Sequence, residues 1–301
     1  MDRDFATDVT HHWTSFRDAE VDKWDKYFAE ALSGRGQEHE DTLWWRISDR
    51  DSFDLLKILC RDKAGVRVLE PACGSGGTSL ALPKHLDVAN IILMDGSPNA
   101  LRFAKDLIPR SLRDRVTIVR GDAFCLPFKD RSFDIVWNVG VIEHYLKPAI
   151  VDLASEMLRV ARQDGFVVLG IPNRHSAAVL KAYVLGTKWG RRWLKFLRGY
   201  RFDTEILYGN QEIAELLSRS FDVDVKITYG GSLLWVGADE RLVRIADRLF
   251  RGSMLSFLTF FVLSPHRCSN HAAARGLQRS FVQPTLDRTA IAAPRNEYHE
   301  R

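Results

Sequence analysis

Short apolar runs alternate with longer amphipathic segments through the middle of this 301-residue chain. Five of these runs, rich in β-branched and long aliphatic residues, occupy residues 66–70, 88–95, 116–119, 133–138 and 166–171. Helix-length segments separate them, which is typical of an α/β fold with parallel strands. Two later runs, at residues 221–229 and 256–263, predict two further strands. The pattern therefore predicts an α/β fold with a seven-strand, mostly parallel sheet flanked by helices.

The regions before and after these runs have different patterns. Residues 18–32 carry apolar side chains at helical spacing up to a Ser-Gly-Arg-Gly stretch, and residues 51–60 predict a second helix. We therefore expect residues 1–63 to form a helical segment ahead of a main domain over residues 64–264. Residues 265–301 are polar and punctuated by prolines, so we expect a largely disordered tail.

The first run leads into a stretch of small residues, Glu70-x-Ala72-x-Gly74-x-Gly76. Glycines in such a turn let a ligand lie against the backbone, and the amides of the following helix point at it. Glu70 adds a carboxylate at the carboxyl end of the strand, where open parallel sheets bind ligands. A dinucleotide-binding turn would have glycine or alanine where Ser79 stands, and a phosphate-binding loop would have a lysine directly after the turn. The site therefore suits a cationic or neutral cofactor better than a polyphosphate.

Polar residues also follow the next three runs. Asp95 ends the second run, 19 residues after Gly76, a spacing that suits a carboxylate accepting both hydroxyls of a ribose. Ser97 can cap the helix that follows. Asp122 stands after the third run and Asn138 ends the fourth. Their common position after successive strands predicts one ligand site.

Together these motifs resemble the class I S-adenosylmethionine-dependent methyltransferases, whose first motif reads acid-x-Gly/Ala-x-Gly-x-Gly. The resemblance covers residues 64–173 closely and extends loosely to residue 264. Glu143-His144 resembles the small-molecule branch, methyltransferase type 11, which includes quinone-biosynthesis enzymes. The resemblance implies a Rossmann-like fold, with S-adenosyl-L-methionine as cofactor and S-adenosyl-L-homocysteine as product. The implied cofactor-binding residues are Glu70, Ala72, Gly74, Gly76, Asp95, Gly96, Ser97, Asp122, Ala123, Asn138, Val139 and Arg46.

The resemblance also implies roles for individual residues. An acid after the third strand meets the adenine amino group and the next amide lies on the ring, which assigns these roles to Asp122 and Ala123. A surface acid in a turn is the alternative for Asp122. The segment before the first strand often closes over the cofactor, so Trp44 or Trp45 could cover it and Arg46 could meet its carboxylate. Ordinary docking of an N-terminal helix on the sheet is the alternative.

His144 is the candidate general base, because an imidazole can accept a proton near neutral pH. It stands just past the fourth strand, near where the transferred methyl should emerge. The alternative is that His144 orients its loop or contacts the cofactor. Since a sulfonium is already a good leaving group, we expect positioning and desolvation of the acceptor to contribute most. No residue pattern indicates a metal site.

Residues 174–201 hold eight Lys and Arg and no Asp or Glu. Aromatic residues at positions 189, 193, 196 and 200 would line one face of a helix. We expect residues 174–209 to form a cap insertion whose charges and rings recognise an anionic or lipophilic acceptor. A solvated face over a core stripe is the alternative. The candidate substrate-binding residues are Trp44, Trp45, Arg174, Trp189, Arg192 and Trp193.

Composition bears on the remaining functional classes. The net charge of +4 is too small to indicate nucleic acid, and Asn138 precedes Val139-Gly140-Val141 instead of the Pro-Pro-Tyr/Phe of amino-group methylation. A small-molecule acceptor is therefore expected, and an RNA or protein methyltransferase or a non-catalytic cofactor-binding module stays open. The four cysteines show no paired spacing and residues 1–13 lack the apolar core of a signal peptide. We expect a cytoplasmic protein, with peripheral contact to an anionic membrane surface through the basic segment.

Overall fold

One mixed sheet forms the centre of the molecule, which the computed structural model describes for residues 3–34, 42–186, 205–235 and 237–265. Its strands are β1 (Val66–Pro71), β2 (Val88–Asp95), β3 (Val116–Arg120), β4 (Phe133–Val139), β5 (Ala161–Pro172), β6 (Val223–Gly230) and β7 (Leu258–Pro265). They lie in the order β3-β2-β1-β4-β5-β7-β6. The predicted seven-strand sheet is thereby confirmed.

The direction of the strands places the motif residues at one edge of the sheet. Strands β1 to β5 pair in parallel, whereas β7 runs antiparallel to both β5 and β6. Strand β4 is buried along all but its last residue, as expected for a parallel strand covered on both faces. The carboxyl ends of β1 to β4, and the polar residues that follow them, therefore share one edge.

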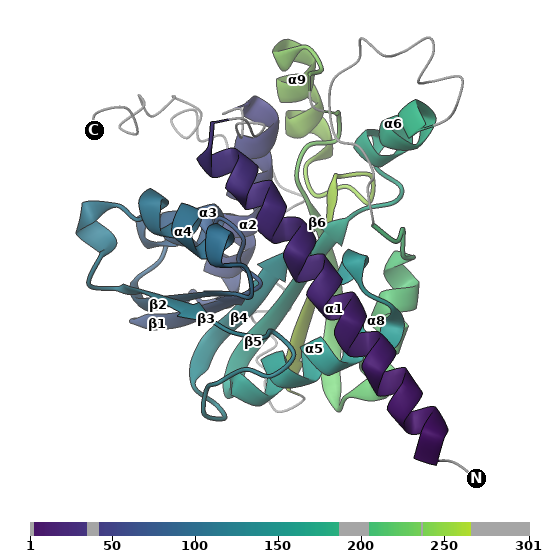
Figure 1. The fold of residues 1–301 in the computed structure, drawn as a ribbon. Coiled ribbons are helices and arrows are strands. Elements are labelled where there is room, and N and C mark those ends of the chain that lie inside the picture. Colours follow the sequence, from purple (N-terminus) through teal and green to yellow (C-terminus); the bar gives the residue numbers. More distant parts are fainter. Residues whose placement is uncertain (1–2, 35–41, 187–204, 236, 266–301) are drawn as a thin grey trace.

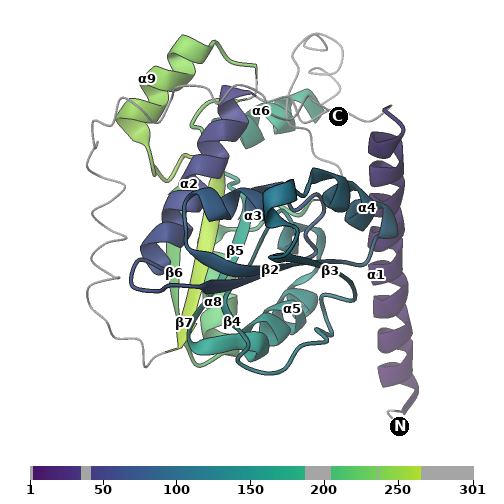
Figure 2. The same ribbon diagram turned by 90° about the vertical axis from the view of Figure 1, so that its left-hand side faces the viewer.

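Helices cover both faces of the sheet (Figure 1). They are α1 (Arg3–Leu32), α2 (Leu43–Leu59), α3 (Gly77–Ala81), α4 (Pro98–Leu107), α5 (Lys147–Val160), α6 (Ala177–Gly186), α8 (Asn210–Ser220) and α9 (Glu240–Phe250), with 3-10 turns η1 (Leu82–Lys84), η2 (Arg110–Leu112) and η3 (Ile142–His144). Helices α2, α3 and α4 lie on one face and α5 and α8 on the other, while α1 lies along one side of the molecule (Figure 2). Helices α6 and α9 stand together at one end in both views.

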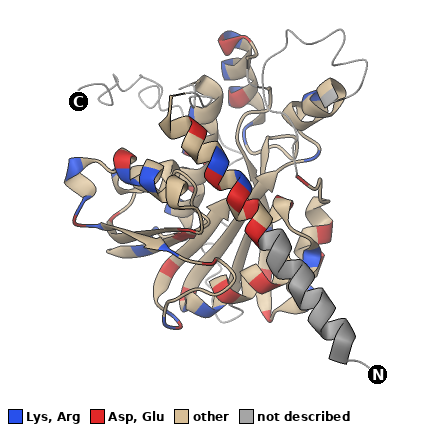
Figure 3. Cartoon of the chain, in the orientation of Figure 1, with Lys and Arg blue, Asp and Glu red and all other residues tan. Residues whose placement is uncertain are grey.

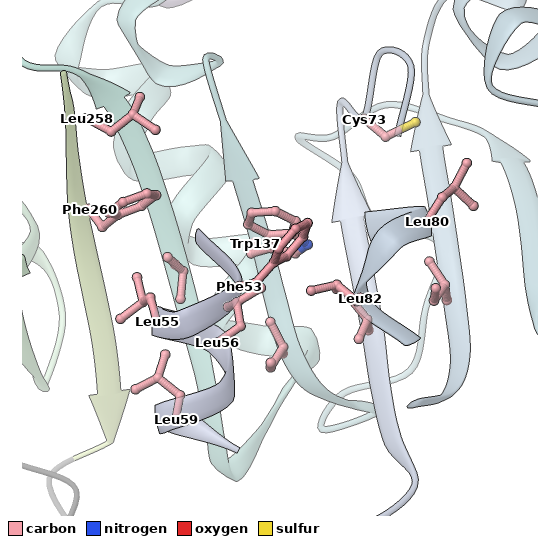
Figure 4. Packing of buried hydrophobic residues seen from close by; sticks show 14 of the residues in the cluster. Phe53, Leu55, Leu56, Leu59, Cys73, Leu80, Leu82, Trp137, Leu258 and Phe260 are labelled. Atoms are coloured by element: carbon pink, nitrogen blue, oxygen red, sulfur yellow. The ribbon is translucent and has the colours of Figure 1, made fainter. Parts of the chain in front are cut away.

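The core on the α2 face joins elements that are far apart in the sequence (Figure 4). Phe53 and Leu56 of α2 pack in one buried cluster with Trp137 of β4 and Phe260 of β7. Trp137 is 1% exposed, and its indole Nε1 donates to the hydroxyl of Ser79 at 3.0 Å. Burying a side chain such as Leu or Phe contributes about 1.5–3 kcal/mol. This cluster therefore stabilises the packing of α2 on β4 and β7.

Helix α2 begins at Leu43, not at Asp51 as the sequence pattern predicted. Thr42 is its N-cap, and the Thr42 hydroxyl accepts from the Trp45 amide at 3.4 Å. The prediction missed this start because adjacent tryptophans interrupt a simple apolar stripe. In the fold, Trp44 is buried while Trp45 packs edge-on against it at the margin of the core, so both are accommodated within one helix.

A buried ion-pair network joins α2 to the C-terminal elements. Asp51 is fully buried, and its Oδ1 accepts from Arg50 Nη2 at 2.8 Å and from Arg251 Nε at 3.0 Å. Its Oδ2 accepts from the Gly231 amide at 2.9 Å, directly after β6. Arg50 also makes two hydrogen bonds of 2.7 Å to Asp247 of α9. We call this set of contacts the Asp51 latch.

The remaining global features concern charge, thiols and hydropathy. Basic and acidic residues are interspersed over the described ribbon (Figure 3). The described cysteines, Cys60, Cys73 and Cys125, are free thiols. Among the described helices, none has both the length and the apolar character needed to cross a membrane.

Two predicted segments fall largely outside the described residues. The predicted cap at 174–209 is described up to Gly186, in α6, and again from Glu205. Trp189, Arg192 and Trp193 lie outside the described residues, and so does the predicted tail beyond Pro265.

Candidate cofactor site

The turn after β1 has the backbone conformation that its small residues predict. Ala72, Gly74 and Gly76 have φ angles of 54°, 53° and 62°, in the left-handed region. A side chain at Gly76 would also clash, because a Cβ there would lie 2.6 Å from a methyl of Leu93. Ala72 adopts the same region at a steric cost, since it carries a Cβ. Such strain persists only where the surrounding structure imposes it and is common at ligand sites.

Glu70 is a buried carboxylate at the carboxyl end of β1. Its side chain hydrogen-bonds to the Ser79 hydroxyl, which in turn accepts from Trp137. Its other oxygen, Oε2, has no hydrogen-bond partner among the described residues. Burial raises the pKa of Glu70 to about 8, the bond from Ser79 opposes this rise, and the nearby carboxylate of Asp95 adds to it. A cation or hydrogen-bond donor placed beside Oε2 would therefore be bound favourably.

Asp95 ends β2 and holds the glycine turn in place. Its Oδ2 accepts from the Gly74 amide at 2.9 Å, and its Oδ1 accepts from the Ser97 amide at 2.8 Å. Burial raises the pKa of Asp95, while these amide bonds lower it. Each carboxylate oxygen accepts about two hydrogen bonds, so both retain capacity for ligand hydroxyls. The Ser97 hydroxyl caps α4 by accepting from the Ala100 amide at 2.9 Å, as predicted.

The turn after β3 places Asp122 and Ala123 next to the end of β2. The Gly121 amide donates to the Asp95 carbonyl at 3.1 Å, which ties the two turns together. Asp122 is exposed, and its Oδ1 accepts from the Phe124 amide at 2.9 Å. Ala123 packs at the margin of the apolar cluster that covers the α5 face. The structure therefore brings Asp122 to the edge that carries Glu70 and Asp95.

The segment after β4 contributes the remaining motif residues. Asn138 is buried, and its amide Nδ2 lies 3.8 Å from the sulfur of Met157 in α5, so its side chain faces that helix. Val139 ends β4, and Gly140 follows with a φ of 83°. His144 is 6% exposed in η3.

Glu143, which the sequence analysis did not select as a site residue, is the second buried carboxylate at this edge. It is 3% exposed, and its Oε1 lies 3.8 Å from where a Cβ on Gly140 would stand. Its Oε2 has no hydrogen-bond partner among the described residues. Burial raises the pKa of Glu143 to about 8, and the charge of Glu205 adds to the rise. Its place beside His144 in the motif was visible in the sequence, but its burial was not.

Comparison with known proteins identifies the domain. Residues 69–169 match the family model described as a methyltransferase domain. These residues form a class I S-adenosylmethionine-dependent methyltransferase domain. The match contains the glycine turn and the ends of β1 to β4, where the site lies.

Three curated relatives align with the methyltransferase domain. Demethylmenaquinone methyltransferase of Shouchella clausii is 29% identical over 133 residues, covering 44% of this chain and 52% of that protein. The 2-methyl-6-phytyl-1,4-hydroquinone methyltransferase of Synechocystis is 34% identical over 105 residues, with coverages of 35% and 31%. The phthiotriol/phenolphthiotriol dimycocerosates methyltransferase of Mycobacterium tuberculosis is 35% identical over 105 residues, with coverages of 35% and 37%. The chain thus spans about half or less of the length of each relative.

A solved structure shows the same fold over a larger part of the chain. Magnesium protoporphyrin IX methyltransferase from Synechocystis PCC 6803, crystallised with bound SAH, superposes with a TM-score of 0.53 at 14% identity. The superposition covers 83% of this chain and 99% of that one. At this identity the likeness supports the methyltransferase fold alone, and it extends well beyond residues 69–169.

Helix α1 covers the site edge of the methyltransferase domain. A Cβ on Gly74 would lie 3.2 Å from the Phe28 ring, and one on Gly96 would lie 3.1 Å from Val21. The Trp24 ring meets the ring of His144 edge-on, with centroids 5.5 Å apart. The three α1 residues lie on one helical face, because they are three and four positions apart. Their helical spacing was visible in the sequence, but nothing local indicated what they contact.

Asp25 fixes α1 to the start of α4. Its Oδ1 accepts from the Ser97 hydroxyl at 2.7 Å and from the Asn99 amide at 3.0 Å, and its Oδ2 accepts from Asn99 Nδ2 at 2.9 Å. The bond from Ser97 is the largest of the effects that lower the pKa of Asp25. An anionic group at a helix N-terminus is stabilised by the unpaired amides there. The sequence analysis missed Asp25 because its partners are more than seventy residues away in the chain.

The other predicted site residues that the structure describes lie on α2 and after β5. Trp44 is 2% exposed, contacts Phe257 and donates from Nε1 to the Leu234 carbonyl at 2.7 Å. Trp44 therefore lies where ordinary docking of its helix on the sheet would place it, and α1 is the element that lies over the glycine turn. Arg46 is half-buried on α2. Arg174 is exposed after β5, and its Nε lies 3.1 Å from Nε2 of His175.

The residues of the site fit S-adenosylmethionine. Glu70 offers a buried carboxylate oxygen without a hydrogen-bond partner among the described residues, which suits the ammonium group of the cofactor. Asp95 retains acceptor capacity for ribose hydroxyls. Gly74 and Gly76 place no side chain of their own between the turn and a ligand, and the Phe28 ring of α1 lies over Gly74. These residues belong to successive strand ends, so they could hold the cofactor together.

Proposed function

We propose that the chain transfers a methyl group from S-adenosylmethionine to an oxygen or nitrogen of a small anionic or lipophilic molecule. The observation that carries this proposal is the cofactor edge of the methyltransferase domain, where Glu70 and Asp95 flank the left-handed glycine turn. The relatives support a small-molecule acceptor, because their names specify menaquinone, phytylhydroquinone and phthiotriol compounds.

The chain's own residues would bind and orient the cofactor and would exclude water from the site. When bound, the cofactor supplies an electrophilic methyl on a sulfonium, which needs no activation by the protein. Glu70 would bind the cofactor's ammonium group, and Asp95 would hold its ribose. Val21, Trp24 and Phe28 of α1 would keep water from the edge, which strengthens electrostatic interactions there.

The oxygen or nitrogen that is methylated loses a proton, and the site offers two side chains that could accept this proton. His144 is the residue selected from the sequence, and its ring lies against Trp24. Glu143 is the stronger structural candidate, because its Oε2 has no hydrogen-bond partner among the described residues and its pKa is raised to about 8. A carboxylate with that pKa is a much better base near neutral pH than an ordinary one. In this proposal, Glu143 accepts the proton that the methylated oxygen or nitrogen loses.

Transfer of an isotope-labelled methyl tests the proposal. The full chain is incubated with labelled S-adenosylmethionine and with extracts separated into quinone, polar-lipid and aqueous fractions, and labelled products are isolated. Label in a small molecule, together with formation of S-adenosylhomocysteine, supports the proposal. Cofactor binding without product in any fraction would support the non-catalytic module instead.

The pH dependence of turnover separates the two proton acceptors. Glu143→Gln should lower kcat by about a hundredfold and remove the rise in rate near pH 8, because general-base catalysis contributes roughly 10²–10⁴-fold. His144→Asn is the matched comparison, and it should leave the pH profile in place. The reverse result would assign the proton to His144.

The basic segment provides the acceptor-recognition part of the proposal. Its eight positive charges without an acid suit an anionic acceptor, and its aromatic residues suit an apolar one. Replacing Arg191, Arg192, Lys195 and Arg198 with glutamine should raise the acceptor KM while cofactor affinity holds. An RNA acceptor would instead show binding that falls steeply with salt, because counterions are released from phosphates.

A further inference from the structure

Helix α9 exposes an apolar stripe to solvent. Leu242, Ile245 and Leu249 are 57%, 55% and 66% exposed. Their spacing of three and four residues places them on one face of the helix. The adjoining side of the helix is already occupied, because Val243 and Ala246 are buried against the domain. The stripe therefore extends the apolar side of α9 beyond the part that the domain buries, and no element within the described ranges covers it.

A stripe of arginines runs beside this apolar stripe. Arg241, Arg244 and Arg248 are exposed, and they immediately precede Leu242, Ile245 and Leu249. Consecutive helical residues are about 100° apart round the axis, so the arginines line one flank of the apolar stripe. We call the three apolar and three basic residues together the α9 face.

The acids of α9 are directed elsewhere. Asp247 points to α2, where it accepts two hydrogen bonds from Arg50 in the Asp51 latch. Asp239 caps the helix by accepting from the Arg241 and Leu242 amides. Glu240 lies 3.6 Å from Arg244 at the first turn. The positive charge on the exposed side of α9 is therefore compensated only at its N-terminal end.

The apolar surface continues past the α9 face. Further exposed apolar side chains are Phe250 at the end of α9, Met254 and Leu255 after it, and Leu180 and Tyr183 on α6. Contacts hold the two helices near each other: Lys181 lies 5.6 Å from the Trp235 ring centre, and Asn173 donates to the Met254 carbonyl at 2.7 Å. Helices α6 and α9 protrude at the same end of the molecule (Figure 1, Figure 2).

We propose that the α9 face docks on the surface of an anionic phospholipid bilayer. Aliphatic residues on one helical face with arginines on the flank are typical of helices that lie in a membrane interface. The arginines are complementary to anionic headgroups. A protein partner is a poorer fit for the stripe, because protein interfaces are anchored by aromatic residues seated in pockets, whereas Leu242, Ile245 and Leu249 are aliphatic and exposed. The exposed aromatic residues Phe250 and Tyr183 lie outside the stripe, and aromatic side chains are also common in membrane interfaces. The docking does not depend on the proposed methyl transfer.

Flotation of the full chain with vesicles tests the proposal. One set of vesicles is phosphatidylcholine alone, and the other is equal parts phosphatidylcholine and phosphatidylglycerol. The chain should bind the anionic set and not the neutral set. The triple variant Leu242→Gln, Ile245→Gln, Leu249→Gln should bind more than about tenfold less. Its matched control, with methionine at the same three positions, keeps the side chains apolar and should bind like the original chain.

The basic stripe is tested separately. Arg241→Gln with Arg248→Gln should weaken binding to the anionic vesicles by about thirtyfold, since each basic residue near such a surface contributes roughly fivefold. Arg113→Gln with Arg115→Gln removes the same charge from exposed positions before β3 and should change binding by less than about twofold. Cofactor affinity, measured by calorimetry on the same variants, should stay unchanged.

Two outcomes would overturn the docking. One is a full chain that does not bind anionic vesicles, or glutamine variants that bind as the original does. The other is a dimer in light scattering that the triple glutamine variant converts to a monomer, which would make a second copy of the chain the occupant of the α9 face. Loss of methyl transfer without any change in vesicle binding would count against the proposed function alone.

Discussion

Two groups of buried carboxylates in this molecule are compensated differently. Asp51, between α2 and α9, accepts hydrogen bonds from two arginines and a backbone amide. Glu70 and Glu143, at the carboxyl edge of the sheet, each have an Oε2 with no hydrogen-bond partner among the described residues. Burial raises the pKa in both regions: at Asp51 the charges of Arg50 and Arg251 oppose the rise without cancelling it, whereas at each glutamate only a hydrogen bond opposes it.

The difference separates a structural acid from a ligand-binding one. A buried charge with all its hydrogen bonds made within the chain has nothing left to offer a ligand, and it connects distant elements. A buried carboxyl group with an unsatisfied oxygen is costly unless another molecule completes it. The cofactor edge therefore carries unsatisfied carboxylate oxygens, which Asp51 in the latch does not have.

The largest expected effect is on the latch. Asp51→Asn should lower the free energy of unfolding by about 3–5 kcal/mol, because it leaves two buried arginine contacts without their counter-charge. Denaturant unfolding measures the loss. Arg219→Gln, which removes the exposed pair with Glu215, is the control and should cost less than about 0.5 kcal/mol. A loss for Asp51→Asn as small as that of the control would end the distinction between the two regions.

Glu70→Gln should change stability in the opposite direction. The pKa of Glu70 is about 8 in the fold against 4.5 ordinarily, so the folded chain holds a proton that the unfolded chain releases between those values. The free energy of unfolding therefore falls as the pH rises from about 4.5 to about 8. Removing the titration should stabilise the protein by roughly 2–4 kcal/mol at pH 8 and by little at pH 5.

The same variant should bind S-adenosylmethionine less tightly. Calorimetry should show this loss of cofactor affinity. Thermal melts at pH 5 and pH 8 measure the change in stability. A variant that is destabilised at pH 8 would show that Glu70 is already compensated within the fold.

Asp95→Ala should weaken cofactor binding by about 1.5–3 kcal/mol, roughly ten- to a hundredfold. The carboxylate supplies ribose contacts, and its bond to the Gly74 amide also holds the turn in shape. Asp106→Ala removes an exposed acid from α4 and serves as the matched control in calorimetry. Unchanged affinity in a folded Asp95→Ala variant would remove the ribose assignment.

Asp25→Asn tests a third kind of acid, one that is well hydrogen-bonded but only half-buried. It should cost about 1 kcal/mol of stability at pH 7, as the loss of a helix cap does. The pKa of Asp25 is lowered from 3.8 in the fold, so its stabilisation is present above that pH and is lost as the pH falls further. Unfolding curves of the variant and the original chain should therefore converge at acid pH. A difference that persists there would point to packing, not charge.

Several parts of this protein could be predicted from the sequence because their causes are local. Short apolar runs rich in β-branched residues, with helix signals between them, are enough to indicate the seven strands, and Ser97 before a proline is enough to indicate a helix start. The turn at Gly74 and Gly76 follows from residue size alone, and both glycines have the left-handed φ that only small residues adopt easily. The same motif carried the resemblance to the methyltransferase class.

Other features were decided only by the tertiary structure. The start of α2 at Leu43, the place of Trp44 in the core and the position of α1 over the glycine turn depend on which surfaces meet. In the sequence, Asp51 follows Arg50 and Glu143 precedes His144, so nothing local distinguishes these two acids.

The sequence by itself thus determined which segments become strands and where the cofactor edge lies, because periodicity and backbone freedom act over a few residues. The fold decided which acids are compensated: Arg251 reaches Asp51 across 200 residues of chain, while nothing described reaches Oε2 of Glu143. Burial and hydrogen bonding of a carboxylate are properties of its surroundings, so only the packed structure could distinguish a latch from a binding site.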